Sequence, residues 1–179
     1  MGDSFSKIIA LFLGVLLLFI FPVLNMFENQ DDTSKVFVLT ETTKFVDAVR
    51  NLGYITPNMY LEFSRKLAVT NNIYAIEMEH HHKQYDPIYE DPTLSSTFKN
   101  DFQVNFKGSY TPVIMEKLFP KNPDPDTTYK LSKSDYFAVR VRNTNKTLAT
   151  KLQQMLFNAN ISAAKIIVRY GGMVKDENY

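Results

Sequence analysis

The sequence predicts an α+β protein in which an N-terminal transmembrane helix is followed by an amphipathic helix and a small mixed sheet with helices on one side. Three observations carry this prediction. An uncharged apolar run lies near the N-terminus, apolar residues at helical spacing follow it, and later segments alternate between apolar and polar residues. The first pattern is typical of a membrane span, the second of an amphipathic helix and the third of half-buried strands.

Residues 8–27 are the predicted membrane span, a run of twenty residues without a charge. A helix of this length rises about 30 Å, which matches the hydrocarbon core of a bilayer. Proline inside the run removes a backbone donor, so a kink is expected near residues 19–21. The residues assigned to the anchor are Ile8, Leu11, Leu16, Phe19, Pro22 and Phe27.

A cleaved secretory signal is the alternative interpretation of this segment. Such a signal has an apolar stretch of about 7–15 residues and a small-residue cleavage site such as A-x-A. Here the stretch is longer, and Phe27 is followed by Glu-Asn-Gln-Asp-Asp without that pattern. An uncleaved anchor is therefore favoured.

The anchor divides the chain into four parts: a short tail at 1–7, the transmembrane helix at 8–27, a juxtamembrane amphipathic helix at 28–53 and an extracytoplasmic α+β domain at 54–179. Basic residues lie on both sides of the span, so the positive-inside bias is weak. The seven-residue tail offers nothing to translocate. We therefore expect a single-pass protein of the cell membrane with its N-terminus inside and its C-terminal domain outside.

The regular part of the juxtamembrane helix is expected from about Lys35 to Asn51, with Ser34 as its N-cap and Gly53 as its C-terminal stop. Apolar and small residues recur at spacings of three or four, which predicts one buried face. The residues of that face are Val36, Leu39, Thr43, Val46 and Val49.

The first half of the outer domain contains the next predicted helix, which opens at Thr56-Pro57 and ends at Asn71-Asn72. Residues 73–85 then alternate, which predicts a strand. One face of that strand carries Tyr74, Ile76, Met78, His80 and His82, and the other carries Glu77, Glu79, His81 and Lys83. A loop at 85–96, a short strand at Phe102–Phe106 and a short helix after Thr111-Pro112 complete this half.

The C-terminal third predicts a strand at Tyr136–Arg142, a helix at 146–157 and a strand at Lys165–Tyr170 that ends at Gly171-Gly172. The helix is expected to bury Leu148, Leu152, Met155 and Leu156. Strand, helix, strand suits either a parallel βαβ unit or a split α+β sandwich, and both alternatives stay open.

Composition narrows the function classes. The formal net charge is +1, so there is no clustered basic excess of the kind that nucleic-acid binding requires. The chain has no cysteine and only six glycines, which excludes cysteine nucleophiles and leaves little material for nucleotide-binding loops. No G-x-S-x-G or H-E-x-x-H motif is present. The sequence predicts a protein that is not an enzyme, uses no cofactor and binds no nucleic acid.

The histidines are contiguous, and two of them carry a metal hypothesis. His80 and His82 project from the same face of the predicted strand, so the pair can bind one metal ion with a third ligand from elsewhere. Their face also carries apolar residues, and the competing interpretation is that both histidines extend a packed surface.

Tyr85, Tyr89 and Tyr110 lie among prolines and acidic residues in predicted loops. An amphipathic ring in such a place can contact a protein partner. The competing interpretation is that these rings line the rim of the small sheet.

Two stretches, FVDAVRNLGYITPNMYLEFSRKLAVTNNIYAIEMEH and AKIIVRYGGMVKDENY, resemble segments of small single-span proteins encoded with Tad/Flp-type pilus or secretion machinery of Gram-positive bacteria. The resemblance implies a pilin-like layout, with one helix half in the membrane and half packed on a head. Gly2 is followed by Asp-Ser-Phe-Ser-Lys, which departs from the glycine and glutamate pattern of processed prepilins.

The expected function is therefore a non-enzymatic, membrane-anchored extracytoplasmic component, an accessory or minor subunit of a pilus or secretion-type surface assembly. Its expected partners are membrane lipid and other protein components of that assembly. The alternative is an extracytoplasmic ligand- or metal-binding module on a single membrane anchor, with the ligand near His80 and His82.

Overall fold

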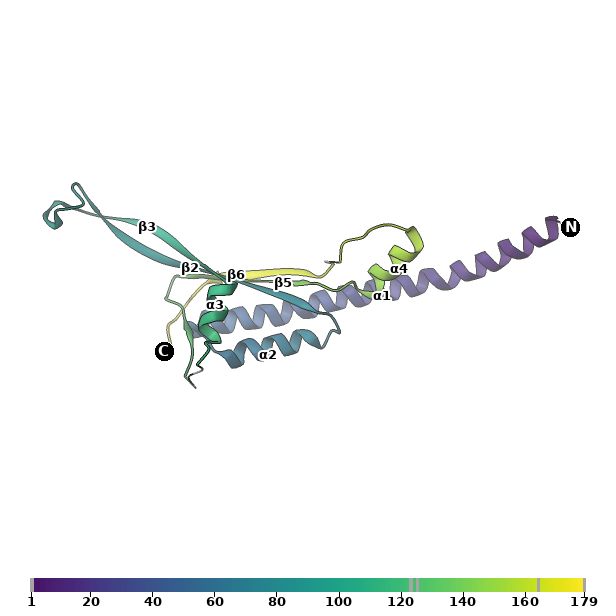
Figure 1. Cartoon of the computed structure of the whole chain (residues 1–179), viewed down its shortest axis with the longest axis horizontal. Coiled ribbons are helices and arrows are strands. Elements are labelled where there is room, and N and C mark those ends of the chain that lie inside the picture. The colour runs from purple at the N-terminus through teal and green to yellow at the C-terminus, as the bar shows by residue number, and fades with distance from the viewer. Residues whose placement is uncertain (1, 123, 125, 164, 179) are drawn as a thin grey trace.

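The computed structural model describes residues 2–122, 124, 126–163 and 165–178. Within these residues the fold is α+β, with a long N-terminal helix, three further α-helices and two antiparallel sheets. Figure 1 shows an elongated molecule with the N-terminal part of α1 projecting at one end and the β2–β3 ribbon at the other. The helices are α1 (Gly2–Leu52), α2 (Pro57–Ala68), α3 (Thr111–Leu118) and α4 (Leu148–Phe157). The strands are β1 (Tyr54–Ile55), β2 (Tyr74–Tyr89), β3 (Phe98–Tyr110), β4 (Tyr129–Lys130), β5 (Tyr136–Asn143) and β6 (Ile167–Met173), and a 3₁₀ turn, η1, covers Ser95–Thr97.

The predicted membrane span and the juxtamembrane helix form one uninterrupted helix. We expected Ser34 to cap a second helix, and this was wrong, because its hydroxyl donates to the Gln30 carbonyl 2.8 Å away within the same helix. Thr33 makes the equivalent bond to the Asn29 carbonyl. Both side chains therefore bond along the helix axis rather than cap a new start. The predicted stop is confirmed: Gly53 has φ +77° and its N–H donates to the Val49 carbonyl.

The buried face of α1 is rotated from the predicted one. Val46 and Val49 are buried as expected, but Val36 and Leu39 are exposed, which corrects the prediction. The buried stripe is Val38, Thr42, Phe45, Val46 and Val49. Thr42 can be buried because its hydroxyl donates to the Val38 carbonyl at 2.7 Å, so that the polar group costs little.

The main sheet has the strand order β3-β2-β5-β6, and all its pairings are antiparallel. The prediction of a mixed sheet was wrong, and so was its parallel βαβ alternative. The reason is the position of α4, which packs against α1 instead of crossing over the sheet. The chain therefore returns from α4 into β6 beside β5 and antiparallel to it.

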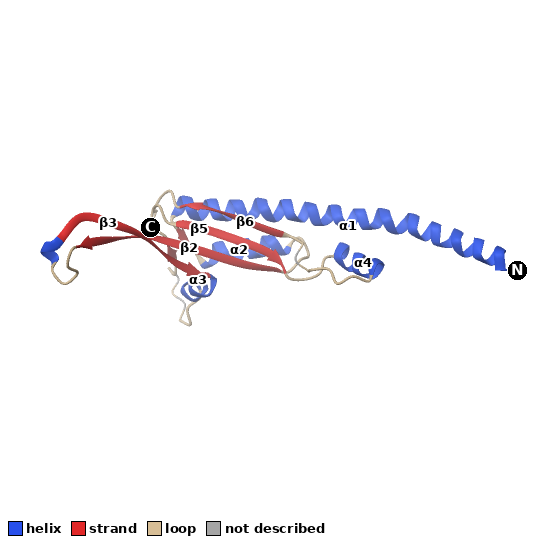
Figure 2. Cartoon of the chain, turned by 90° about the horizontal axis from the view of Figure 1, so that it is seen from above, coloured by secondary structure: helices blue, strands red, loops and turns tan. Residues whose placement is uncertain are grey.

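Helices cover one face of this sheet, as predicted (Figure 2). α1 packs against β5 and β6, and α3 packs against β2 and β3. Phe137 of β5 is fully buried and contacts Phe45 of α1, with ring centroids 6.4 Å apart. The opposite face is polar and carries ion pairs, such as Arg142–Glu77 at 3.1 Å. The core therefore lies between α1, α2 and one sheet face.

The remaining elements follow the predictions in part. Thr56 caps α2 by accepting the Met59 N–H, as the Thr-Pro signal indicates. The predicted buried face of α4 was wrong, because Leu148 and Met155 are exposed. The residues that α4 buries are instead Ala149 and Thr150, where it packs near α1. β6 continues through Gly171-Gly172, where the predicted strand ended.

Gly53→Ala is expected to lower the free energy of unfolding by about 1–3 kcal/mol, because residue 53 needs the left-handed conformation that L residues avoid. A methyl group there would also lie 2.5 Å from the Asp176 carbonyl oxygen. Gly14→Ala is the matched control, since its added carbon meets nothing within 4 Å. Denaturant unfolding of both variants in detergent checks this, and equal stabilities would contradict it.

Candidate functional site

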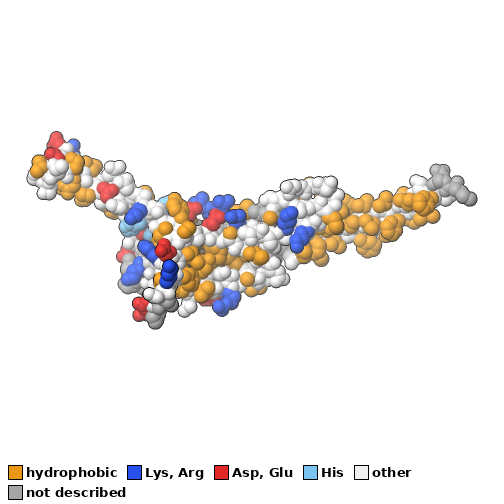
Figure 3. Space-filling view, viewed as in Figure 1, with side chains coloured by type: hydrophobic (Ala, Val, Ile, Leu, Met, Phe, Trp, Pro, Cys, Tyr) orange, Lys and Arg blue, Asp and Glu red, His pale blue; other side chains and the backbone are white. Residues whose placement is uncertain are grey.

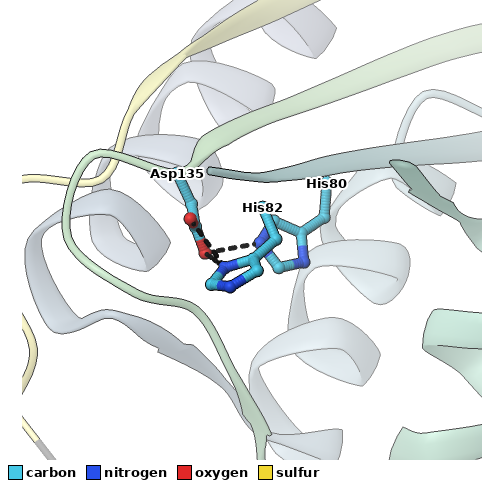
Figure 4. Close-up of side chains that lie close together, drawn as sticks. All are labelled: His80, His82 and Asp135. Atoms are coloured by element: carbon cyan, nitrogen blue, oxygen red, sulfur yellow. Dashed lines mark hydrogen bonds and ion pairs between the residues drawn. The ribbon is translucent and has the colours of Figure 1, made fainter. Parts of the chain in front are cut away.

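His80, His82 and Asp135 come together where β5 begins and its pairing with β2 ends (Figure 4). His80 and His82 lie on the same face of β2, as the alternation predicted. Asp135 directly precedes β5 and is held by a tight turn in which Ser134 has φ +71°. The Asp135 carbonyl accepts the Val174 N–H at 2.7 Å, which anchors the turn to the end of β6.

The Asp135 carboxylate is the centre of this cluster. It accepts hydrogen bonds from His80 Nε2 at 2.8 Å and from His82 Nδ1 at 3.0 Å. It also accepts the backbone N–H groups of Lys83 at 3.0 Å and Ser132 at 2.8 Å. The Asp135 side chain is 1% exposed. Four donors around one buried carboxylate compensate for the water that it loses.

These bonds fix the protonation of the cluster. Burial raises the pKa of the Asp135 carboxyl, but the four hydrogen bonds outweigh burial and bring this pKa below its ordinary value. Burial lowers the pKa of His80, against the pull of the Asp135 carboxylate. Asp135 is therefore ionised and His80 neutral at neutral pH. Neutral His80 then donates from Nε2 to Asp135 and accepts at Nδ1 from the Tyr129 hydroxyl 2.7 Å away.

The cluster opens onto a cleft of about 440 Å³. His82 links the buried cluster to the cleft, because its side chain is 45% exposed while its Nδ1 hydrogen-bonds the buried Asp135 carboxylate. Three lysines from β3, α3 and β4 line the cleft: Lys107, Lys117 and Lys130. The Lys117 ammonium lies 5.5 Å from the centroid of the Tyr129 ring. Among the described residues that line it, the cleft thus has three lysines and one carboxylate, that of Asp135, which is buried at the back.

Sequence reasoning found two members of this cluster and missed the third. Asp135 is separated from the histidines by more than fifty residues and stands alone in the segment Lys-Ser-Asp-Tyr. Nothing in the local pattern marks it. Only the antiparallel pairing of His81 with Tyr136 brings residue 135 beside β2.

Five of the six anchor residues lie on the part of α1 that projects from the body, residues 4–23, which we call the stem. One helix, Ser4–Leu52, is long and apolar enough to cross a membrane, and its apolar window is almost entirely exposed. Of the six anchor residues, Phe27 is half-buried just beyond the stem and the other five are exposed: Ile8, Leu11, Leu16, Phe19 and Pro22. The long apolar helix is thus compatible with a single-pass membrane protein.

Beyond His81, β2 no longer pairs with β5, and residues 82–107 form a two-stranded ribbon that we call the arm. The predicted strand at Phe102–Phe106 is confirmed as part of the longer β3. The predicted loop at 85–96 was wrong over residues 85–89, which continue β2 and pair with β3, whereas residues 90–96 do lie outside the strands. Tyr85 and Tyr89 lie in β2 and Tyr110 ends β3, so none of them is in the predicted loops. Prolines are accommodated because the ribbon has a free edge on each side.

The arm has an apolar face and a polar face. Tyr85 pairs with Val104, and Pro87 with Phe102, so their side chains share one face. The exposed residues of this apolar arm face are Tyr85, Phe102, Val104 and Phe106, each between 43% and 58% exposed, and Tyr110 lies on the same face of β3 beyond the arm. On the other face Asp86 accepts hydrogen bonds from Gln84 and Asn105. Tyr89 lies nearer the tip and packs against Phe98, with centroids 5.6 Å apart.

The apolar arm face lies on the opposite side of the ribbon from the core. In the body, the even-numbered residues Met78 and His80 of β2 point toward the helices. In the arm, the odd-numbered Tyr85 is apolar and exposed. Because side chains alternate along a strand, the arm cannot bury this face by bending onto its own helices.

Neither a family model, nor a curated protein, nor a solved structure matches this chain.

Proposed function

We propose that this protein is a non-enzymatic, membrane-anchored component of an extracytoplasmic surface assembly, with the stem in the bilayer and the arm bound to a protein partner. The observation that carries the proposal is the placement of two exposed apolar surfaces at opposite ends of one rod (Figure 3). Exposed apolar surface of this extent is typical of membrane or protein contacts. The body between them has a packed core, and its surface mixes charged and apolar side chains.

The start of the body supports a membrane boundary after residue 27. The first acidic residues of α1 already bond with the region of α4: Glu28 accepts from Gln153, and Asp31 accepts from the Thr147 hydroxyl at 2.7 Å. Before them, the exposed side chains of the helix are almost all apolar. A bilayer would therefore end where these polar contacts begin, with the body directly outside it.

The arm supports a protein partner. A two-stranded ribbon is marginally stable alone in water. This one nevertheless carries a row of exposed aromatic and apolar side chains, including Phe102 and Phe106. Interface cores are enriched in such residues. A partner that covers the apolar arm face would bury these rings and stabilise the ribbon.

The layout supports a pilin-like role. One helix supplies both the apolar stem and the helix that packs on an antiparallel sheet, as the resemblance to Tad/Flp-encoded proteins implies. We propose an accessory or minor subunit of such an assembly, with the N-terminus inside the cell and the body outside.

The buried cluster supports a role other than catalysis. Tyr129, His80 and Asp135 bond in the order of a nucleophile, a base and an orienting carboxylate. However, the Tyr129 side chain is 3% exposed, so almost none of it meets the cleft that it borders. We therefore assign Tyr129 to the buried network rather than to a reaction.

Substitutions on the apolar arm face test the proposed function. In the full chain, Phe102→Asp with Phe106→Asp is expected to abolish crosslinking of the protein into larger complexes in membranes of the cells that make it. The control is Lys99→Ser with Gln103→Ser, which changes β3 without touching the Asn105–Asp86 hydrogen bond and is expected to keep the complexes. Complexes of unchanged size and amount in the first variant would contradict the proposal.

A further inference from the structure

We propose that His80, His82 and Asp135 form a binding site for one divalent transition-metal ion of the zinc class, at the root of the arm. The inference goes beyond the proposed function and does not depend on it. Each residue offers one ligand atom, and the three atoms lie within 4.8 Å of one another. The three side chains point toward one another (Figure 4).

The distances fit a metal after a rotation of His82. Tetrahedral zinc with bonds of about 2.0–2.1 Å separates its ligand atoms by roughly 3.3 Å. The carboxylate lies 2.8 Å from His80 Nε2 and 3.0 Å from His82 Nδ1, so these two contacts open to ligand spacing with a shift of a few tenths of an ångström. The widest separation among the three ligand atoms is up to 4.8 Å and has to close by roughly 1.5 Å. The half-exposed His82 ring can turn to supply that larger movement.

The surroundings provide a place for both displaced protons. Metal binding at His80 Nε2 requires the proton on Nδ1, which lies 2.7 Å from the Tyr129 hydroxyl oxygen and can donate to it. Binding at His82 Nδ1 requires the proton on Nε2, which lies on the exposed part of that ring. The Tyr129 hydroxyl, which donates to His80 without the metal, then turns its own proton toward the Ser109 side chain, its other hydrogen-bonding neighbour. A hydrogen-bonded second nitrogen is the usual support of a metal-bound histidine.

The Asp135 carboxylate is also held in the position of a metal ligand. Backbone N–H groups of Lys83 and Ser132 remain bonded to Asp135 when the imidazole protons leave. These bonds keep the carboxylate ionised and oriented, as ligating carboxylates require. The site would thus contribute one negative charge and two neutral nitrogens.

The ligand set selects the metal. Two imidazoles and one carboxylate suit zinc and its neighbours, whereas calcium and magnesium prefer sites built from oxygen alone. Three protein ligands leave a fourth position, which faces the cleft. Because Lys107, Lys117 and Lys130 line that cleft, an anionic fourth ligand is favoured: hydroxide, or a carboxylate of a partner.

The position of the site suggests what the metal does. His82 pairs with Lys107 at the first step of the arm, and Asp135 belongs to the turn that leads into β5. A metal bonded to both would hold the arm at a fixed angle to the body.

The test uses the full chain in detergent, stripped with a chelator and titrated with zinc chloride. We expect one zinc ion per chain by elemental analysis and calorimetry, and a raised thermal midpoint. Cobalt chloride should give the intense visible absorption of a tetrahedral site. His82→Ala removes a half-exposed ligand and is expected to weaken zinc binding at least about a hundredfold, more than second-sphere changes do.

His81→Ala is the matched control, because His81 is next in sequence but on the opposite face of β2. It is expected to leave the zinc affinity within about twofold, well inside the effect of losing a ligand. Substoichiometric binding by the unaltered chain would overturn the proposal. So would equal effects of the two alanine variants, or zinc binding that His82→Ala leaves unchanged.

Discussion

Asp135→Ala is expected to lower the free energy of unfolding by about 3–5 kcal/mol, because it leaves one buried and several partly buried donors without their shared acceptor. The Lys83 and Ser132 N–H groups and the His80 ring all lose the bond that compensates for their burial. Denaturant unfolding of the full chain in detergent, followed by circular dichroism with a chelator present, measures this without any metal contribution.

Asp101→Ala is the control for this prediction, since Asp101 is exposed on β3. Its effect is expected to stay within about 0.5 kcal/mol, as for most surface substitutions. A loss below about 1 kcal/mol for Asp135→Ala would show that the cluster is not the buried network described here, because one unsatisfied buried group alone costs that much.

Leu16→Arg with Phe19→Arg is expected to release most of the protein from membranes. Each arginine near the centre of a spanning helix costs about 2.5–3.5 kcal/mol on insertion scales, so the pair costs several kcal/mol. Both side chains are exposed in the fold, so the body is expected to stay folded. Flotation of vesicles containing each variant separates bound from free protein.

Val36→Arg with Leu39→Arg is the matched control, because these apolar side chains are also exposed on α1 but lie beyond the predicted span. This variant is expected to float with the vesicles like the unaltered chain. If both variants floated equally, membrane binding would not depend on the stem.

Much of the fold could be predicted from local patterns. The apolar stem, the stop at Gly53, the Thr56 cap and the alternation of β2 and β5 each depend on residues close in sequence, and the structure has all four. The rotated face of α1 was missed because the pattern of apolar residues admits two overlapping stripes. Val36 and Leu39 looked buried, but the sheet approaches from the side of Val38.

The missed parts of the site depend on contacts between distant segments. The arm could not be predicted because its turn residues, such as Pro87, are typical of loops, while its strands are held only by each other. Asp135 could not be predicted because a single aspartate acquires its role only when β5 pairs with β2. The pairing of His81 with Tyr136 is a property of the whole sheet.

The central claim is that the stem remains on the protein and lies in a bilayer. Carbonate extraction of membranes from cells that make the unaltered protein, followed by mass analysis, tests it most directly. The claim predicts the intact chain of 20.7 kDa in the membrane pellet, released only by detergent. Recovery in the carbonate supernatant, or of a shorter chain lacking residues 8–27, would contradict it.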